Sequence, residues 1–312
     1  MTDRTKGNIA LLITAIVWGT GFIGQKLGME ALPPLAFNGT RQLLAGALLL
    51  PIMVSNVKKT GYLDRTKHSV DSINFRKKKL LKAGLICGIL MVLGTNLQQV
   101  GLMTVSAGKS GFISAVYIVF VPLVGLFFGR KIGLQTAGCC LLAMVGFGFL
   151  SLKGGLAGTT PGDWLTLASA LSFALQITAV NCFVDKDNDI IISTLQMIFT
   201  GIFTLVISFF FEQASMEGFV QSIPVILYTA FIPTAIGYTL QIVGQKYAEP
   251  TTAAFLMSLE AVFAVLFGAI MLGETMSLRE TIGAGLIFVS NILIQYEPKS
   301  SKKNKARSLD KR

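Results

Sequence analysis

Two stretches of the chain share one pattern: GTNLQQVGLMTVSAGKSGFISAVYIVFVPLVGLFF (Gly94–Phe128) and GYTLQIVGQKYAEPTTAAFLMSLEAVFAVLFGAIM (Gly237–Met271). A constant offset of 143 residues aligns them without a gap and pairs Gln98 with Gln241. Unrelated apolar helices share leucines and valines by chance, but a shared G-x-x-L-Q-x-V-G is much harder to obtain that way. We infer an internal duplication, and a repeat of this kind has to be settled before single elements are assigned.

The composition indicates that most of the chain is surrounded by lipid. The 312 residues are 52% hydrophobic and 14% charged, with a mean hydropathy of +0.65. A soluble protein carries about 25% charged residues. The net charge of +11 would suit a nucleic-acid-binding protein, but the basic residues lie between the apolar runs and in the tail. We therefore expect the lipid bilayer as partner and no nucleic acid.

The apolar runs have the length of membrane spans, because a spanning helix needs about 20 mostly apolar residues. The sequence thus predicts an all-α integral membrane protein with about ten transmembrane helices. The predicted spans are residues 8–27, 35–54, 81–102, 107–129, 133–152, 162–183, 190–211, 223–246, 251–272 and 278–296.

The basic residues predict the orientation, since cytoplasmic loops carry an excess of Lys and Arg. They gather before the first span, in the 55–80 loop and in the 297–312 tail, whereas the loops on the other side hold few. We expect a multi-pass protein of the cell membrane with both termini in the cytoplasm. The acidic loop from Asp185 to Asp189 runs against this pattern, but acidic residues contribute little to the rule.

The duplication divides the ten spans into two groups of five. Because five is odd, the second group must enter the membrane inverted relative to the first. An offset of 155 extends the repeat to earlier spans and pairs Arg41 with Gln196. We expect a first repeat over 1–153, which includes the 55–80 loop, a second over 160–296, and a basic tail over 297–312. Inverted repeats recur in secondary transporters, whose sites lie between the halves.

Glu260 is the sharpest functional signal, because it lies near the middle of a predicted span. A carboxylate there is costly unless it faces a wet cavity, has a partner or is protonated. It either lines a transport pathway, where it would bind a substrate amine or carry a proton, or it closes a helix–helix contact. Its repeat mate is Tyr117, so a phenol and a carboxylate would face one cavity.

Four further polar or aromatic residues lie within predicted spans: Arg41, Gln98, Gln241 and Trp18. Arg41 either recognises a substrate carboxylate or is a snorkelling or packing arginine that ties its helix to a loop. The two glutamine amides need partners in lipid, so they contact substrate, hold helices together or mark two separate gates. Trp18 either packs between helices or forms an aromatic wall, since Trp is otherwise usual at membrane interfaces.

We expect no cofactor, no metal site and no catalytic residue. The four cysteines lie in apolar runs without C-x-x-C spacing, and the one histidine, His68, lies in a charged loop. Gly19, Gly21 and Gly24 form a literal G-x-G-x-x-G inside an apolar helix with no strand before it. Small residues at this spacing instead let helices approach closely. No P-loop is present, so ATP does not drive the protein.

Several short motifs identify a known family. The run W-G-x-x-F-x-x-x-K begins at Trp18, Arg41 lies in F-N-G-T-R-Q-L-L-A-G, and L-G-E ends at Glu274. With the two five-helix halves, the chain resembles the EamA-type transporters of the drug/metabolite transporter superfamily over nearly its whole length. The resemblance implies a ten-helix inverted-repeat carrier with a central cavity lined mainly by helices 1, 3, 4, 6, 8 and 9. Its relatives export amino acids and other small metabolites.

The chain departs from that family pattern in three places. The first half ends without the acidic residue that the second half has at Glu274, the 55–80 loop is long, and Ala261 follows Glu260 where a proline is common. We expect a secondary transporter, an exporter of a small metabolite such as an amino acid, with a homodimer as one possible assembly. A membrane-embedded lipid-modifying enzyme is the alternative, although the chain offers no obvious cluster of catalytic groups.

Overall fold

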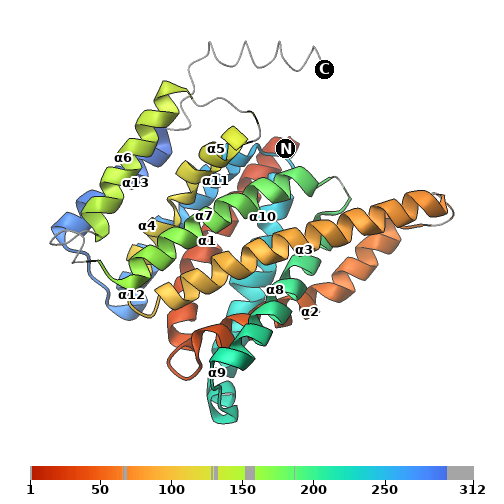
Figure 1. Cartoon of the computed structure of the whole chain (residues 1–312), viewed down its shortest axis with the longest axis horizontal. Coiled ribbons are helices and arrows are strands. Elements are labelled where there is room, and N and C mark those ends of the chain that lie inside the picture. Colours follow the sequence, from red (N-terminus) through yellow and green to blue (C-terminus); the bar gives the residue numbers. More distant parts are fainter. Residues whose placement is uncertain are drawn as a thin grey trace.

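The computed structural model describes residues 2–64, 66, 69–127, 129, 133–151, 159–185 and 187–293 as helices and short connections, with no strand among them (Figure 1). The helical elements in chain order are α1 (Asp3–Gly28), α2 (Pro34–Thr60), α3 (Val70–Gly101), α4 (Ala107–Ser114), α5 (Tyr117–Phe127), α6 (Leu134–Ser151), α7 (Pro161–Phe183), α8 (Asp189–Phe211), α9 (Met216–Thr229), η2 (Ala230–Ile236), α10 (Gly237–Gln245), α11 (Pro250–Ser258), α12 (Glu260–Leu272) and α13 (Leu278–Leu293).

Within these described ranges, nine helical stretches are long and apolar enough to cross a membrane. They match nine of the ten predicted spans, and α13 lies in the tenth, whose last three residues fall outside the described part. The all-α membrane fold predicted from the sequence is thus confirmed. The basic tail over 297–312 lies outside the described residues, as do His68 and parts of two predicted loops.

The connection between α2 and α3 is shorter than the predicted 55–80 loop. Helix α2 continues to Thr60 and ends at Gly61, whose φ of 67° closes the helix in the left-handed conformation. Helix α3 already begins at Val70, where the Ser69 side chain accepts a hydrogen bond from the Ser72 N–H. Lys and Arg are good helix formers, so the basic run extends α3 instead of forming a loop.

Two of the spans are each broken into two shorter helices. The fourth span consists of α4 and α5, separated by Ala115 and Val116, and the ninth consists of α11 and α12, separated by Leu259. Pro122 lies inside α5, after the break. The 143-residue offset pairs the first residue of α5, Tyr117, with the first residue of α12, Glu260.

The eighth span is a continuous helix that changes its winding in the middle. Helix α9 passes into the π-helical segment η2, which contains Pro233, and then into α10. A proline lacks the N–H that an α-helix needs, and π-helical turns often lie at functional sites. The wider turn here directs backbone carbonyls towards α1.

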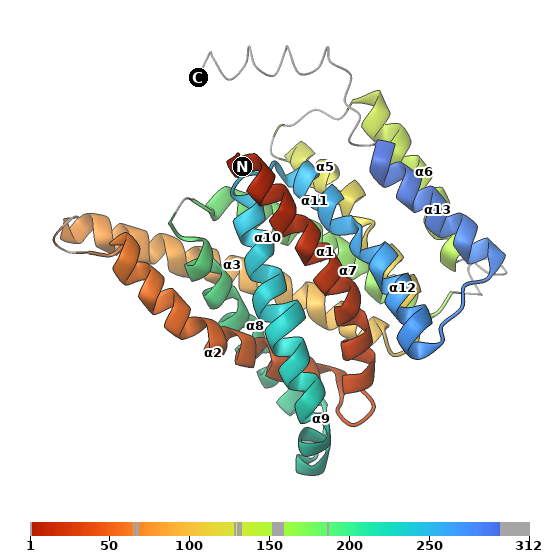
Figure 2. The same cartoon turned by 180° about the vertical axis from the view of Figure 1, so that it is seen from behind.

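The helices pack in pairs that bring distant parts of the sequence together. Helix α2 packs along α8, α3 against α7 and α8, and α1 between α10 and α12, while α6 and α13 lie side by side at one edge in both views (Figures 1 and 2). Gly19, Gly21 and Gly24 allow the close approach of α1, because an added Cβ would collide with Phe263, Pro233 and Thr229. The expected packing role of these glycines is confirmed.

One end of the bundle is held by the carboxylate of Glu274, just beyond α12; we call it the Glu274 end. Oε1 accepts hydrogen bonds from the Ala107 N–H (2.9 Å) and from Lys26 Nζ (3.1 Å), and Oε2 accepts from the Gly108 N–H (3.1 Å). A carboxylate at a helix N-terminus satisfies free N–H groups and the helix dipole. Glu274 thus joins α1, α4 and the end of α12.

Candidate functional site

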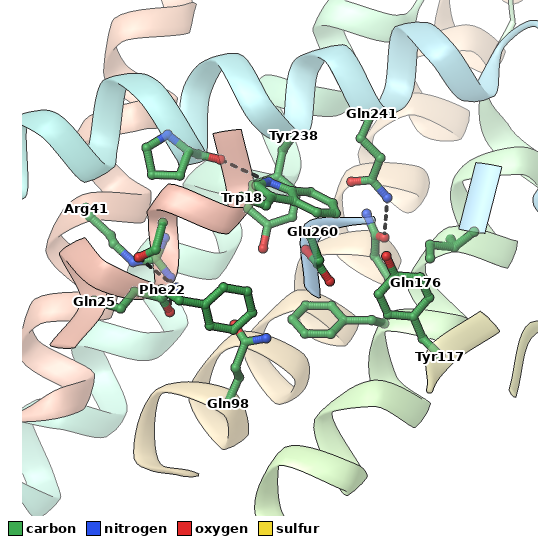
Figure 3. Close-up of a pocket in the computed structure, with 14 residues that line it drawn as sticks. Trp18, Phe22, Gln25, Arg41, Gln98, Tyr117, Gln176, Tyr238, Gln241 and Glu260 are labelled. Carbon is green, nitrogen blue, oxygen red and sulfur yellow. Dashed lines mark hydrogen bonds between the residues drawn. The ribbon is translucent and has the colours of Figure 1, made fainter. Parts of the chain in front are cut away.

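A pocket lies inside the bundle, between spans of both halves of the chain (Figure 3). The structure brings all six residues that were singled out from the sequence into its lining: Trp18, Arg41, Gln98, Tyr117, Gln241 and Glu260. They come from α1, α2, α3, α5, α10 and α12. Arg41 and Gln25 lie at one side of the pocket in Figure 3, and Tyr117 and Gln176 lie at the other.

The pocket is small in this conformation. Its cavity volume is about 30 Å³. One water needs a cavity of roughly 10–15 Å³, so there is room for about two waters. A larger solute enters only when the surrounding helices move apart.

Glu260 begins α12 and is 4% exposed. The backbone stays helical through Leu259 but hydrogen-bonds irregularly there, so the Glu260 carboxyl group lies beside an irregular turn inside the bundle. The Tyr117 side chain lines the same pocket from the other interrupted span, and its hydroxyl has no hydrogen-bond partner. The expectation that this phenol and this carboxylate face one cavity agrees with the geometry.

Arg41 is 3% exposed, so its guanidinium does not reach the surface of the protein. Its Nη1 donates to Thr234 Oγ1 in η2 (2.9 Å), and its Nη2 donates to Gln25 Oε1 in α1 (3.2 Å). Its Nε has no hydrogen-bond partner. The guanidinium therefore links three helical elements, and its Nε–H makes no hydrogen bond.

The two paired glutamines lie in the same pocket but make different contacts. Gln98 Nε2 donates to Ser114 Oγ at the end of α4 (2.8 Å). Gln241 Nε2 donates to Gln176 Oε1 (2.9 Å), and Gln176 Nε2 donates to Gln196 Oε1 (3.1 Å). The common pocket favours a single site over the alternative of two separate gates.

Trp18 forms part of an aromatic wall. Its indole Nε1 donates to the Pro233 carbonyl of η2 (3.1 Å), and its ring centroid lies 4.9 Å from that of Tyr238. A buried indole N–H needs an acceptor, and the π-helical turn supplies one. Trp18 thus both packs against η2 and faces the pocket, so the two interpretations from the sequence are compatible.

Eight lining residues were not proposed from the sequence as pathway residues, although Gly21 was expected to serve helix packing. They are Gly21, Phe22, Gln25, Phe173, Gln176, Ile177, Pro233 and Tyr238. Gln25 and Gln176 carry the same signal as Gln98, an amide in an apolar run, and could have been found by it. The aromatic and aliphatic members have no such signal, because the sequence does not show which face of a helix is turned inward.

The described part of the chain contains no group of three or more His, Cys, Asp or Glu side chains placed to hold a metal ion. Its cysteines are free; three are buried, and Cys182 is exposed. The polar groups of the pocket are instead amides, phenols, one guanidinium and one carboxyl group. Groups of these kinds can donate hydrogen bonds to a polar solute and accept them from it.

The sequence matches the model of one known protein family. The model of the EamA-like transporter family matches residues 5–152 and again residues 160–296. The chain belongs to the EamA-like transporter family. The resemblance inferred from the motifs around Trp18, Arg41 and Glu274 is confirmed.

Similar proteins are named as transporters. An uncharacterized transporter of Archaeoglobus fulgidus is 30% identical over 293 residues, which cover 93% of this chain and 86% of that protein. The uncharacterized inner membrane transporter YedA of Escherichia coli is 25% identical over 296 residues, 91% and 89% of the two chains. The uncharacterized transporter YoaV of Bacillus subtilis is 24% identical over 289 residues, 89% and 93%. Family and relatives support a multi-pass membrane transporter.

One solved crystal structure, whose description names no function, has the same fold. It matches with a TM-score of 0.67 at 13% sequence identity and covers 94% of this chain and 97% of that one. At this identity the match concerns the fold alone.

Proposed function

We propose that the protein is a secondary transporter that exports a small metabolite, such as an amino acid, by alternating access. The observation that carries the proposal is the buried polar pocket to which helices of both halves contribute. Polar and ionisable groups deep in a membrane bundle are expensive and typically mark a substrate or ion pathway.

Two inverted five-helix repeats, divided between residues 153 and 160, are part of this proposal. Three observations support them. The family model matches the chain twice. The breaks of the fourth and ninth spans lie at equivalent positions of the two halves. The second span, α2, packs on the seventh, α8, and the fifth span, α6, packs on the tenth, α13, which are their proposed equivalents in the second half.

The small volume of the pocket and the contacts at the two ends of the bundle support alternating access. The space of about 30 Å³ is too small for an amino acid, so a loaded state requires the halves to separate. At the Glu274 end, Glu274 joins Lys26 to the N-terminus of α4. At the opposite end, Lys246 pairs with Asp189. We propose that these two sets of contacts break alternately, so that the pocket opens to one side of the membrane at a time.

The proposed location is the cell membrane, with both termini in the cytoplasm. The distribution of Lys and Arg supports this orientation, and the relative YedA is named an inner membrane transporter. The Glu274 end then faces the outside. One chain lines the whole pocket, so a homodimer would be an assembly of two complete transport units.

The proposed driving force is the substrate gradient or a coupled ion, with Glu260 as the proton carrier. Its carboxyl group is buried, faces the pocket and lies at a break in the span. The names of the relatives favour transport over the lipid-modifying enzyme considered from the sequence.

The proposal is tested with purified protein in liposomes, by counterflow of labelled amino acids and other small metabolites with and without an imposed pH gradient. We expect saturable exchange of one chemical class, and a gradient effect that Glu260→Gln removes. Glu217→Gln, which removes an exposed carboxylate, is the matched control and should keep the effect. Folded protein that exchanges no compound of the panel would refute the proposal.

A further inference from the structure

The outer face of α3 changes from apolar to basic along the helix. The 32 residues of α3 correspond to about 48 Å, which exceeds the roughly 30 Å of a bilayer's hydrocarbon core. Figures 1 and 2 show the first turns of α3 projecting from the bundle beside the end of α2. We propose that α3 and α8 together bind one anionic phospholipid, with its phosphate on Lys78 and Lys82 and an acyl chain in a groove between the two helices.

One stripe of exposed side chains marks where α3 leaves the hydrocarbon. Positions three or four residues apart share one face of a helix. Towards the projecting end of α3, this stripe consists of Leu93, Ile89, Leu85, Lys82 and Lys78. Its apolar part ends at Lys82, because a lysine ammonium extends from the apolar core towards the polar headgroups. The two lysines therefore lie at the depth of the lipid headgroups.

Both lysines are available to an anion. Lys78 and Lys82 are exposed, and neither takes part in an ion pair among the described residues. Their neighbour Lys79 instead pairs with Asp185 (3.7 Å). Like charges four residues apart on a helix repel each other. A phosphate that accepts hydrogen bonds from both ammonium groups offsets this repulsion, and lysines beside a membrane span attract anionic lipids.

An apolar groove lies between α3 and α8. Its volume is about 360 Å³, and its lining consists of Ile89, Val92 and Leu93 of α3 and Phe203, Val206 and Ile207 of α8. The groove begins where the close contact of the helices ends. At Gly84 and Gly88 an added Cβ would lie 2.5 Å and 2.8 Å from side chains of α8, whereas the later glycines of α3 contact α7. A groove without polar side chains suits a hydrocarbon chain.

The spacing between the lysines and the groove matches the depth of one lipid. Half of the hydrocarbon core is about 15 Å thick, which corresponds to roughly ten residues of a helix. Val92 follows Lys82 by that number of residues and lines the groove. A phospholipid whose phosphate lies at Lys82 therefore has the lower part of its acyl chain at the level of the groove. Headgroup and chain thus have separate, matching contacts.

The bound lipid would contact both proposed halves of the chain, since α3 belongs to the first and α8 to the second. The two helices also contact each other directly, because Thr200 Oγ1 donates to the Gly88 carbonyl (3.2 Å). A ligand that binds only the folded protein stabilises it. The lipid should therefore raise the melting temperature. This inference goes beyond the proposed function, because it depends neither on transport nor on which side of the membrane is cytoplasmic.

The test compares lipids that differ only in their headgroup. Protein purified in detergent and freed of lipid is titrated with palmitoyl-oleoyl phosphatidylglycerol or phosphatidylcholine. Bound lipids are counted by native mass spectrometry, and a thermal melt is recorded beside each titration. We expect one phosphatidylglycerol per chain to bind about tenfold or more tightly than phosphatidylcholine, because two lysines favour the anion. Glycerol phosphate, which lacks acyl chains, should neither bind nor stabilise at the same concentrations.

One double variant tests the headgroup contact. Lys78→Gln combined with Lys82→Gln should reduce the preference for phosphatidylglycerol to about twofold or less. Both side chains are exposed, so the fold should be kept. The matched control is Arg4→Gln combined with Lys6→Gln, which removes two exposed charges at the start of α1. This control should keep the preference of the unmodified protein.

A second pair of variants tests the groove. Leu93→Trp places a larger side chain in the groove and should weaken the binding of phosphatidylglycerol severalfold. Leu266→Trp is the control, because Leu266 lies on α12, away from the groove, and is exposed to nearly the same extent as Leu93. This substitution should leave lipid binding unchanged. A difference between the two variants would assign the acyl chain to the space between α3 and α8.

Four results would overturn the inference. The first is equal binding of the two phospholipids, which would leave only unspecific lipid around the protein. The second is a preference that survives the double lysine variant. The third is binding of glycerol phosphate as tight as that of the lipid, which would indicate a site for free phosphate. The fourth is a dimer that forms in place of lipid binding and is lost in Leu93→Trp, which would show that a second copy of the chain covers the groove.

Discussion

The stretches over 94–127 and 237–270 have the same backbone plan and different chemistry. In both, a helix is followed by a short helix, a break and a second short helix, and the short helices begin at paired residues, Ala107 with Pro250 and Tyr117 with Glu260. The polar groups at the paired positions differ. The same backbone interruption therefore forms with different residues at the paired positions.

The sharpest way to test this comparison is to remove the polar or charged group at each break position in turn. Glu260→Gln should lower exchange of the best substrate roughly tenfold to a hundredfold, because about 1.5–3 kcal/mol of charge-assisted hydrogen bonding is lost. Tyr117→Phe should lower it several-fold at most, since the Tyr117 hydroxyl has no well-aligned partner. Initial rates of counterflow in liposomes measure both. Equal losses in the two variants would contradict the asymmetry.

The paired glutamines should differ in their contribution to stability. Gln241→Leu removes a donor from Gln176 inside a buried chain of amides and should cost about 1–3 kcal/mol in the free energy of unfolding. Gln98→Leu removes a single bond to Ser114 and should cost about 1 kcal/mol. Denaturation in detergent compares the two variants directly. A larger loss for Gln98→Leu would reverse the order expected from the network.

The N-termini of the paired short helices offer a third difference. Helix α4 has two N–H groups bound by the Glu274 carboxylate, whereas α11 begins at Pro250, which has no N–H to satisfy. Glu274→Ala should therefore destabilise the protein by about 1 kcal/mol, the usual cost of a lost helix cap. A thermal melt beside Glu217→Gln, whose carboxylate is exposed, measures the loss. A melting temperature equal to that of the control would contradict a capping role.

We expect the smallest effect from a substitution of Pro122, which the 143-residue offset pairs with Val265. The ninth span has the same break, although its only proline is Pro250, at the first residue of α11. Pro122 is therefore not needed for the break of the fourth span. Pro122→Ala should change stability by less than about 0.5 kcal/mol and leave exchange within about twofold. Melting and counterflow again check this outcome, and a loss of exchange would show that Pro122 maintains the break.

Much of the fold and of the candidate site could be predicted, because both depend on signals that lie along the sequence. Apolar length locates the spans, and a polar side chain in the middle of a span, such as Glu260 or Gln241, has to turn inward. The break at Leu259 and the π-helical turn at Pro233 depend on packing between distant helices. A local sequence pattern therefore does not predict either of them. The inward aromatic residues Phe173 and Tyr238 are missed for the same reason.

The contact between Trp18 and η2 also gives the protein its own optical reporter. The chain has two tryptophans, Trp18 in the pocket and Trp164, which is 45% exposed on α7. In a Trp164→Phe background the remaining emission would come from Trp18 alone. A solute in the pocket, or a displacement of the Pro233 carbonyl from the indole N–H, would change the polarity around that ring. Binding and opening could thus be followed as a shift in the emission maximum of Trp18, without an added fluorescent label.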